Sequence, residues 1–258
     1  MERNYISFSQ INLYSLCGVQ YYYRYIAGIK TPSSPAQIQG KNFHAALELN
    51  LRQKIDSGAD IPLQQMEDFY TDATEKAFAD EVFLKAAEAE KGKTAVRDEI
   101  LKKGLIALKT YHREHAPGVQ PLEVEKGFFA NLGEDMPPLY GIIDLITTDL
   151  RVIDHKTASK SPSEGDADKS QQLSAYAIGF NTLYGMDPTS LELQYTVVTE
   201  KGNAKAVTLK TQRSKDQIAR FLNRARAAVH GIQKEVFCPP DQSSWACGCC
   251  AYREMCQF

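Results

Sequence analysis

Two aspartates and a lysine form the group with the clearest chemical potential in this sequence of 258 residues. Asp144 lies within the apolar run GIIDLI, and Asp154 follows Val152 and Ile153, two residues before Lys156. A carboxylate inside a hydrophobic strand is costly unless it is paired or bound to a metal ion. Paired carboxylates are the ligands that Mg²⁺ or Mn²⁺ needs, and a nearby lysine can orient a water molecule. The group therefore predicts a divalent-metal site, although acidic residues and lysines also occur at strand ends for structural reasons alone.

This chemistry makes a demand on the turn between the two aspartates. Side chains alternate along a strand, so Asp154 and Lys156 must share a face. A three-residue connection, Thr148 to Leu150, would place Asp144 directly opposite Asp154, whereas a two-residue turn would put them on opposite faces. The metal site therefore requires an odd-length loop or a β-bulge.

The surrounding sequence predicts a helical first half followed by a sheet. We expect a helix from Ser9 to about residue 26, a second over 36–57, and two or three more between 63 and 115. From Pro121 onward, LEVEKGFFA, LYGIIDLITT and LRVIDHKT have the composition of strands. A helix over 171–184, strands over 191–199 and 204–211, and a helix over 215–234 follow. The pattern is typical of an α/β fold with a mixed-sheet core and a helical flank.

We expect a single domain spanning residues 1–258. Its parts would be a mainly helical flank (1–120), an α/β core (121–236) and a cysteine-rich tail (237–258). Hydrophobic residues make up 43% of the chain and the formal net charge is −2, so one sizeable core is possible, and a protein that coats nucleic acid is disfavoured. Neither a signal peptide nor a membrane span is predicted, which indicates a cytoplasmic protein without a membrane partner.

Six cysteines suggest a second metal site. The tail reads Cys247-Gly-Cys249-Cys250-Ala-Tyr-Arg-Glu-Met-Cys256, with Cys238 before it and Cys17 far upstream. In a reducing compartment, clustered thiols are more often metal ligands than disulfides. Four thiolates bind either zinc or an iron–sulfur cluster, and the spacing alone does not choose between them.

Four motifs together resemble the RecB-type PD-(D/E)XK nucleases. They are GIIDLI, VIDHKT, the segment from Gln172 to Tyr176 (QLSAY), and Gly40-Lys-Asn-Phe-His44. The resemblance implies a restriction-endonuclease-like core and a role for each matching residue. The implied metal ligands are Asp144, Asp154, His44 and the backbone carbonyl of His155. Lys156 would position or activate the water, and Gln172 and Tyr176 would hold the DNA backbone or Lys156.

The cysteines are similar to those of an iron–sulfur subset of this family, which includes the AddB nuclease and CRISPR-associated adaptation nucleases. That subset has one cysteine before the nuclease core and a C-x2-C-x5-C pattern after it. The resemblance implies a 4Fe-4S cluster that pairs the tail with the upstream cysteine, with zinc as the alternative. The matching ligands are Cys17, Cys247, Cys250 and Cys256. Cys238 and Cys249 are surplus, and the spacing from Ser9 to Cys17 is one residue longer than the pattern.

The expected function is that of a metal-dependent DNA nuclease, using Mg²⁺ or Mn²⁺. By resemblance it is an exonuclease acting on single-stranded DNA ends. Without a phosphate-binding loop of its own it would need a separate helicase, recombination or integrase protein. A non-catalytic DNA-binding adaptor with a structural zinc or iron–sulfur site, and a DNA endonuclease, are the alternatives. Phage recombination, CRISPR adaptation and DNA repair are all compatible pathways.

Two further groups of residues could bind a phosphate or a metal ion. Basic residues outnumber acids between Lys201 and Arg226, which favours either a solvated helix or a phosphate-binding patch. His112 and His115 are expected to be exposed helix residues and not a metal pair.

Overall fold

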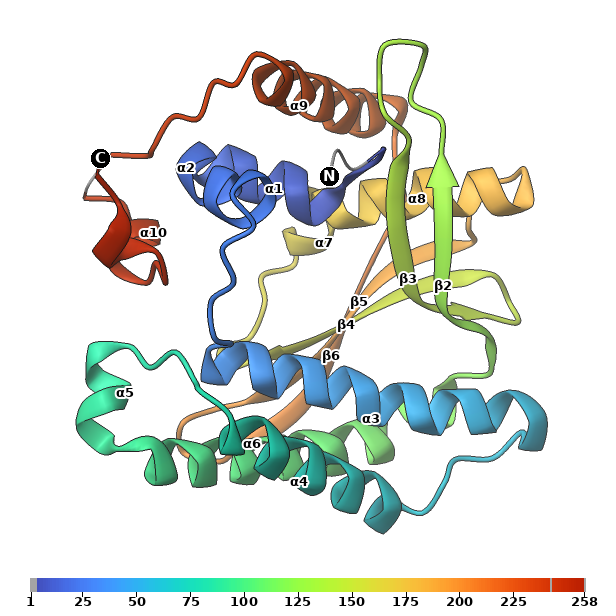
Figure 1. Ribbon diagram of the computed structural model, residues 1–258. Helices are drawn as coiled ribbons and strands as arrows, with labels where there is room; N and C mark the ends of the chain where they lie inside the picture. Colours follow the sequence, from blue (N-terminus) through green and yellow to red (C-terminus); the bar gives the residue numbers. More distant parts are fainter. Residues whose placement is uncertain (1–3, 242, 258) are drawn as a thin grey trace.

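A mixed sheet between two helical layers forms the molecule (Figure 1). The computed structural model describes residues 4–241 and 243–257. In that part of the chain six strands form one sheet in the order β1-β3-β4-β5-β6, with β2 paired to β3. The pairs β1/β3 and β4/β5 are parallel and the others antiparallel. The strands are β1 (Ile6–Ser7), β2 (Pro121–Ala130), β3 (Leu139–Thr147), β4 (Arg151–Ala158), β5 (Ser190–Val198) and β6 (Ala204–Thr211).

The helices divide between the two sides of the sheet (Figure 1). One layer contains α3 (Pro35–Ser57), α4 (Leu63–Ala79), α5 (Ala86–Lys91) and α6 (Lys93–Glu114). The other contains α1 (Phe8–Leu16), α8 (Gln171–Tyr184) and α9 (Lys215–Gln233). Short helical turns are α2 (Gly18–Tyr21), α7 (Asp166–Lys169) and α10 (Trp245–Gly248), with a π-helical turn at Tyr22–Ile26 and 3₁₀ turns at Ala116–Gly118 and Arg253–Met255. This is the α/β fold with a mixed sheet and helical flank that the sequence predicts. None of the helices in the described ranges is long and apolar enough to cross a membrane.

The connection between β3 and β4 has the predicted length. It runs from Thr148 to Leu150, whose φ of 62° gives the tight turn. Leu145 pairs with Ile153, and the same register carries Asp144 opposite Asp154. The required odd-length loop is therefore confirmed.

The alternation of β2 and β3 is interrupted at one facing pair, Glu125 and Asp144. On β3, Ile143 packs into the core under α8 and α9, but Leu145, two residues on, packs into the core under α3 and α6. Two residues apart on a regular strand would share a face, so the strand changes face at Asp144. Glu125, with a φ of 51°, marks the same change on β2. A left-handed conformation costs an ordinary residue about 1–2 kcal/mol, and such strain is concentrated at functional sites.

The first predicted helix differs most from the structure. It begins at Phe8, because Ser7, and not Ser9, accepts a hydrogen bond from the Gln10 amide as the N-cap. It ends at Leu16, because Cys17 is extended, with φ −162° and ψ 109°. The chain then restarts as α2, and the Cys17 sulfur accepts a hydrogen bond from the backbone amide of Gln20. The break turns the Cys17 side chain into a cap for a new helix.

The cysteine-rich tail returns to the start of the chain. The Gly18 amide donates to the Cys238 carbonyl at 2.8 Å. A Cβ at Gly18 would lie 2.7 Å from the Cys238 nitrogen, so only glycine permits this approach. Tyr252 donates from its hydroxyl to the Ile29 carbonyl at 3.0 Å. The two ends of the described chain are therefore in direct contact.

Candidate active site

Asp144 occupies the point where β3 and β4 separate. Backbone pairing between these strands is confined to the two residue pairs nearest the turn. Beyond them, the His155 amide donates to Asp144 Oδ2 at 3.1 Å, so a side chain takes the place of a backbone acceptor. Tyr176 on α8 donates to Asp144 Oδ1 at 3.0 Å, and His44 Nδ1 on α3 lies 3.3 Å from Oδ2. Asp144 is thus reached from both helical layers.

Lys156 is held in a chain of contacts on the α8 side of the sheet. Its Nζ lies 2.7 Å from Asp154 Oδ2 and donates to Gln172 Oε1 at 2.9 Å. Gln172 Nε2 in turn donates to the Tyr176 hydroxyl at 3.0 Å. With the bond from Tyr176 to Asp144, the network runs without a break from the lysine to the aspartate. Gln172 and Tyr176 lie one helical turn apart, which lets both face the sheet.

Asp154 is the most deeply buried acid of the site, with no exposed surface. It forms an ion pair with Lys156, and its two oxygens have no hydrogen-bond donor within the described residues. Burial first, and then the charge of Asp144, raise the pKa of Asp154. Burial acts to lower the pKa of Lys156, but the nearby Asp154 outweighs it and the pKa is raised. A buried carboxylate with free lone pairs is a ready cation ligand.

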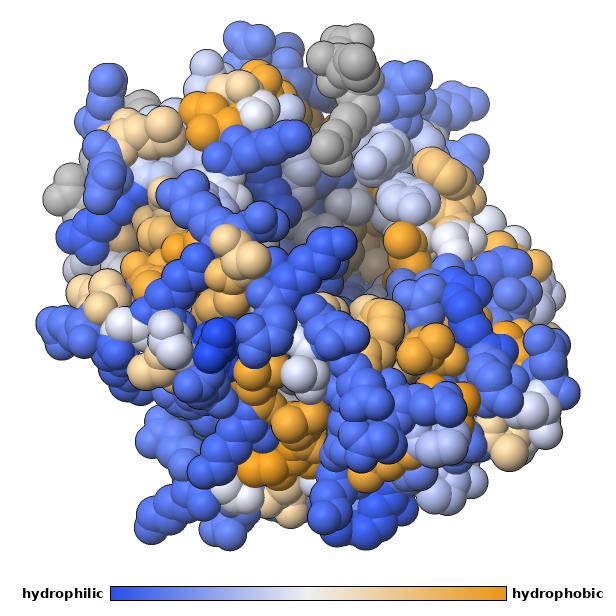
Figure 2. Space-filling view, turned by 60° about the horizontal axis from the view of Figure 1, so that its bottom comes forward, coloured by the Kyte–Doolittle hydropathy of each residue, from blue (hydrophilic) through white to orange (hydrophobic). Residues whose placement is uncertain are grey.

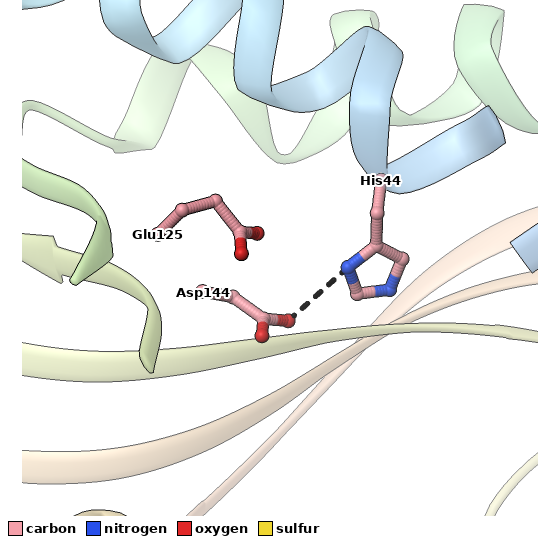
Figure 3. Close-up of side chains that lie close together, drawn as sticks. All are labelled: His44, Glu125 and Asp144. Atoms are coloured by element: carbon pink, nitrogen blue, oxygen red, sulfur yellow. Dashed lines mark ion pairs between the residues drawn. The ribbon is translucent and has the colours of Figure 1, made fainter. Parts of the chain in front are cut away.

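A third acid, Glu125, joins this site from β2 (Figure 3). Ligand atoms of His44, Glu125 and Asp144 all lie within 4.8 Å of one another. Burial, followed by the charges of Asp144 and Glu48, raises the pKa of Glu125 to about 7. Glu125 was not predicted from the sequence, because LEVEKGFFA does not reveal which of its residues faces Asp144 across β2 and β3. The mutual repulsion of these acids is what a bound cation would relieve.

The donor set suits a hard divalent cation. The amide of His155 points at Asp144, and within a strand the carbonyl of a residue points to the same side as its amide. The His155 carbonyl therefore faces the same gap as the carboxylates of Glu125 and Asp144. Carboxylate and carbonyl oxygens with one imidazole match the preferences of Mg²⁺ and Mn²⁺. The residues present thus fit such an ion, and Asp154, which has no exposed surface, is the most deeply buried of the acids.

The imidazole of His155 has a different place from its backbone. It is buried among the residues of the α6 side, with its ring centre 5.4 Å from that of Tyr111. Burial lowers its pKa well below the ordinary value, so the ring is neutral. Only the main chain of this residue lies at the candidate metal site.

The four cysteines of the predicted cluster act on one another electrostatically. Burial raises the pKa of Cys17, and the thiols of Cys247 and Cys256 raise it further. Burial likewise raises the pKa of Cys250, with added contributions from the other three. The surplus residue Cys249 instead points its sulfur at the Trp245 carbonyl, 3.4 Å away.

Two weaker expectations need correction. Arg224 is not free to bind phosphate, because it donates to Asn12, Ser15 and Gln171 and so ties α9 to α1 and α8. His115 is buried, with its Nε2 at 3.1 Å from the Tyr195 carbonyl, and burial lowers its pKa. The helical periodicity placed Arg224 on a helix correctly, whereas His115 lies just beyond the last residue of α6; in neither case did it reveal the neighbouring segments that cover the side chain.

The comparison with protein families decides the class of this site. The family model of the PD-(D/E)XK nuclease superfamily matches residues 5–257. The chain belongs to this superfamily. It is therefore a nuclease, a hydrolase of phosphodiester bonds, and nucleases of this superfamily use divalent metal ions.

One solved structure supports the fold. The chain resembles a protein from Eubacterium rectale described as "Putative exonuclease", with a TM-score of 0.52 and 12% identity, over 95% of this chain and 87% of that one. A second structure, named SSO0001, has 13% identity and a TM-score of 0.37, over 96% and 94% of the two chains. No curated protein matches the sequence.

Proposed function

We propose that residues 1–258 act as one nuclease domain that hydrolyses DNA from single-stranded ends with Mg²⁺ or Mn²⁺. The observation that carries this proposal is the row of three acids across neighbouring strands. The strand registers place Asp144 of β3 opposite Glu125 of β2 and opposite Asp154 of β4, with Lys156 beside the last. A non-catalytic adaptor would have no reason to keep Asp144 between two further acids that it repels, beside a half-buried lysine.

Each residue has a distinct task in this mechanism. His44, Glu125, Asp144, Asp154 and the His155 carbonyl would hold the metal. When bound, the ion polarises the phosphate and lowers the pKa of a water molecule. Lys156, fixed by Gln172, orients that water and offsets negative charge as it develops. Tyr176 holds the Asp144 carboxylate in one orientation through its hydrogen bond.

The depth of the acids supports a single-stranded substrate. Asp144 is 9% exposed and Asp154 is fully buried, and both lie where two strands separate between helical layers. Figure 2 shows a hollow near the middle of a largely hydrophilic face. A flexible single strand can bring a phosphate to acids this deep more easily than a stiff duplex can. The similarity of the fold to the Eubacterium rectale protein described as an exonuclease supports action from an end.

The decisive experiment compares wild type with Lys156→Ala on labelled single-stranded and double-stranded DNA with Mn²⁺. We expect a loss on the order of 10³-fold, because the lysine acts on the reacting groups. Lys160→Ala, an exposed lysine in the following loop, is the matched control. Equal activity of wild type and Lys156→Ala would sink the mechanism. Cleavage of circular single strands would instead assign an endonuclease, and DNA binding without cleavage an adaptor.

We also propose that the protein belongs to the iron–sulfur subset, RecB-like, with Cys17, Cys247, Cys250 and Cys256 holding a 4Fe-4S cluster. Their mutual electrostatic influence supports this ligand set, and zinc is the alternative. The cluster would be structural, because it would close a loop of almost the whole chain and so lower the entropy of the unfolded state. A reducing compartment such as the cytoplasm would keep these thiols available.

Iron and sulfide analysis of anaerobically purified protein tests this assignment. We expect a brown protein whose visible absorption disappears in Cys247→Ser but persists in Cys249→Ser, the matched control two residues away. A colourless wild type containing zinc would replace the iron–sulfur assignment with zinc.

Unwinding of duplex DNA would come from a separate helicase, recombination or integrase partner, in repair, phage or CRISPR pathways.

A further inference from the structure

Three aromatic rings, one exposed and two half-buried, form a cluster at the ribbon of β2 and β3. The ring centres of Phe129 and Tyr140 lie 4.8 Å apart, and that of Tyr5, just before β1, lies 5.0 Å from Tyr140 and 6.2 Å from Phe129. Phe129 is 60% exposed, more than any other phenylalanine in the described part of the chain. Apolar surface gathered at one place, next to a candidate active site, is typical of a binding surface. We call these three residues the aromatic platform.

The platform lies on the same side of the sheet as the acids of the candidate metal site. Phe128 packs against Gly179 of α8, so Phe129, the next residue, faces away from α8. Glu125 reaches His44 of α3, which also lies on the side away from α8. The pair Phe129/Tyr140 and the pair Glu125/Asp144 are separated by four residues on each strand. At about 3.4 Å per residue, the platform is roughly 13 Å from the acids.

An open shelf connects the two. The pair between them is Gly127 and Ile142. A Cβ at Gly127 would meet no atom within 4 Å, and Ile142 is 40% exposed. Arg52 of α3, an exposed cation paired with Glu48, is close enough to act on the pKa of Glu125. The ribbon therefore offers aromatic faces, then free space and then metal ligands, and a cation of α3 lies near the last of these.

We propose that the aromatic platform stacks with unpaired bases of the DNA strand about two nucleotides from the phosphate that is cut. Flat aromatic rings bind every base through its face, without sequence preference. The distance of about 13 Å corresponds to two steps of an extended strand, whose phosphates lie further apart than the roughly 3.4 Å rise of a stacked one. This inference rests on the proposed nuclease function, and it adds a reason for the single-strand preference, because bases in a duplex are not free to stack on protein.

Acids limit the path on its far side. Glu134 and Asp135, in the connection between β2 and β3, line the same surface hollow as Tyr5. These carboxylates would repel further phosphates, so the strand must leave the ribbon beyond the platform. The contact is therefore expected to cover only two or three bases.

The first test measures binding of a fluorescent twelve-nucleotide thymidine oligomer by anisotropy, with Mn²⁺ and with Lys156→Ala as the non-cleaving parent. Phe129→Ala should weaken binding roughly 10-fold, and Phe129→Trp should retain it. Phe69→Ala, an exposed phenylalanine on α4, is the matched control and should change nothing. Gly127→Val should also weaken binding while the melting temperature holds or rises, because valine suits a strand. Unchanged binding in Phe129→Ala and Gly127→Val would overturn the platform.

The second test separates the platform from the active site. Thymidine 5′-(p-nitrophenyl phosphate) has no neighbouring base, so Phe129→Ala with an intact Lys156 should hydrolyse it as wild type does. On oligomers, one abasic position two nucleotides from the cut should slow wild type but not Phe129→Ala. If wild type cleaves both substrates and the abasic position slows the two proteins equally, base stacking on the platform is wrong and the nuclease function is retained. If wild type cleaves neither, the nuclease function itself falls. A change of oligomeric state in Phe129→Ala with unchanged DNA binding would assign the patch to a second copy of the chain.

Discussion

The two sides of the candidate active site differ in how their charges are satisfied. On the α8 side, Lys156 contacts Asp154 and Gln172, and the network continues through Tyr176. On the α3 side, Glu125 and Asp144 lie beside the His44 imidazole, Glu48 adds negative charge, and Arg52 offsets part of it. The α8 side thus links its lysine to neighbouring protein groups, and the α3 side gathers acids around one imidazole. The difference indicates that the α3 side is built for a cation from solution, while the α8 side positions the lysine.

Asp144 belongs to both sides, so its loss should have the largest effect. Asp144→Asn removes a charged ligand and leaves Tyr176 and the His155 amide with a weaker acceptor. We expect a loss of DNA cleavage on the order of 10³-fold, together with loss of Mn²⁺ binding by calorimetry. Asp56→Asn, an exposed aspartate on α3, serves as the control. Mn²⁺ binding that survives in Asp144→Asn would contradict the division into two sides.

Glu125→Gln should affect only the α3 side. Because one of several oxygen ligands is weakened, we expect a 10- to 100-fold rise in the Mn²⁺ concentration for half-maximal cleavage, on the order seen for groups that support metal sites. High Mn²⁺ should restore most of the rate, which it should not do in Lys156→Ala.

Glu123→Gln, on the same strand but in a surface ion pair with Lys126, is the matched control. A Glu125→Gln protein whose rate is low at every Mn²⁺ concentration would place Glu125 with the reacting groups and not with the metal.

The same two sides differ in how far the sequence predicted them. Lys156 follows Asp154 by two residues, and Gln172 precedes Tyr176 by four, so strand and helix periods alone bring each pair onto one face. The sequence also predicted that the loop after β3 has an odd number of residues, because the two aspartates must share a face. These local spacings explain why the α8 side was predicted almost completely.

Glu125 was missed because its place depends on long-range register. It faces Asp144 only through the pairing of β2 with β3. Its backbone is left-handed, which a glutamate in a sequence does not indicate. The break at Cys17 escaped prediction for a similar reason, since the tail approaches that point from the other end of the chain. Helix and strand ranges followed from periodicity, whereas contacts between distant segments required the fold.

Tyr176→Phe should have a smaller effect, because it loosens a ligand without removing it. The substitution deletes the hydrogen bond to Asp144 and the acceptor for Gln172. A hydrogen bond to a charged group is worth about 1.5–3 kcal/mol, so we expect roughly a 10-fold fall in kcat.

Half-maximal Mn²⁺ should change little in Tyr176→Phe if the tyrosine serves the α8 side. Tyr184→Phe, on the same helix and stacked on Phe180, is the control. A large shift in Mn²⁺ dependence without a fall in kcat would move Tyr176 to the α3 side of the comparison.

The smallest expected effect is on stability, and it tests whether the α3 side is strained without metal. The pKa of Glu125 is about 7 in the folded protein against an ordinary 4.5. Between these values the folded protein keeps a proton that the unfolded chain releases, so metal-free stability should fall as pH rises through this window. Because Glu125 is only partly buried, solvent screening reduces the effect to about 1 kcal/mol, or about 3 °C in melting temperature. Glu125→Gln should remove this part of the fall between pH 5 and 8, and Glu123→Gln should not.

Mn²⁺ competes with the same proton, so its affinity should rise over that range in wild type and more weakly in Glu125→Gln. An identical pH dependence in the two proteins would show that Glu125 is not an acid held at a cation site.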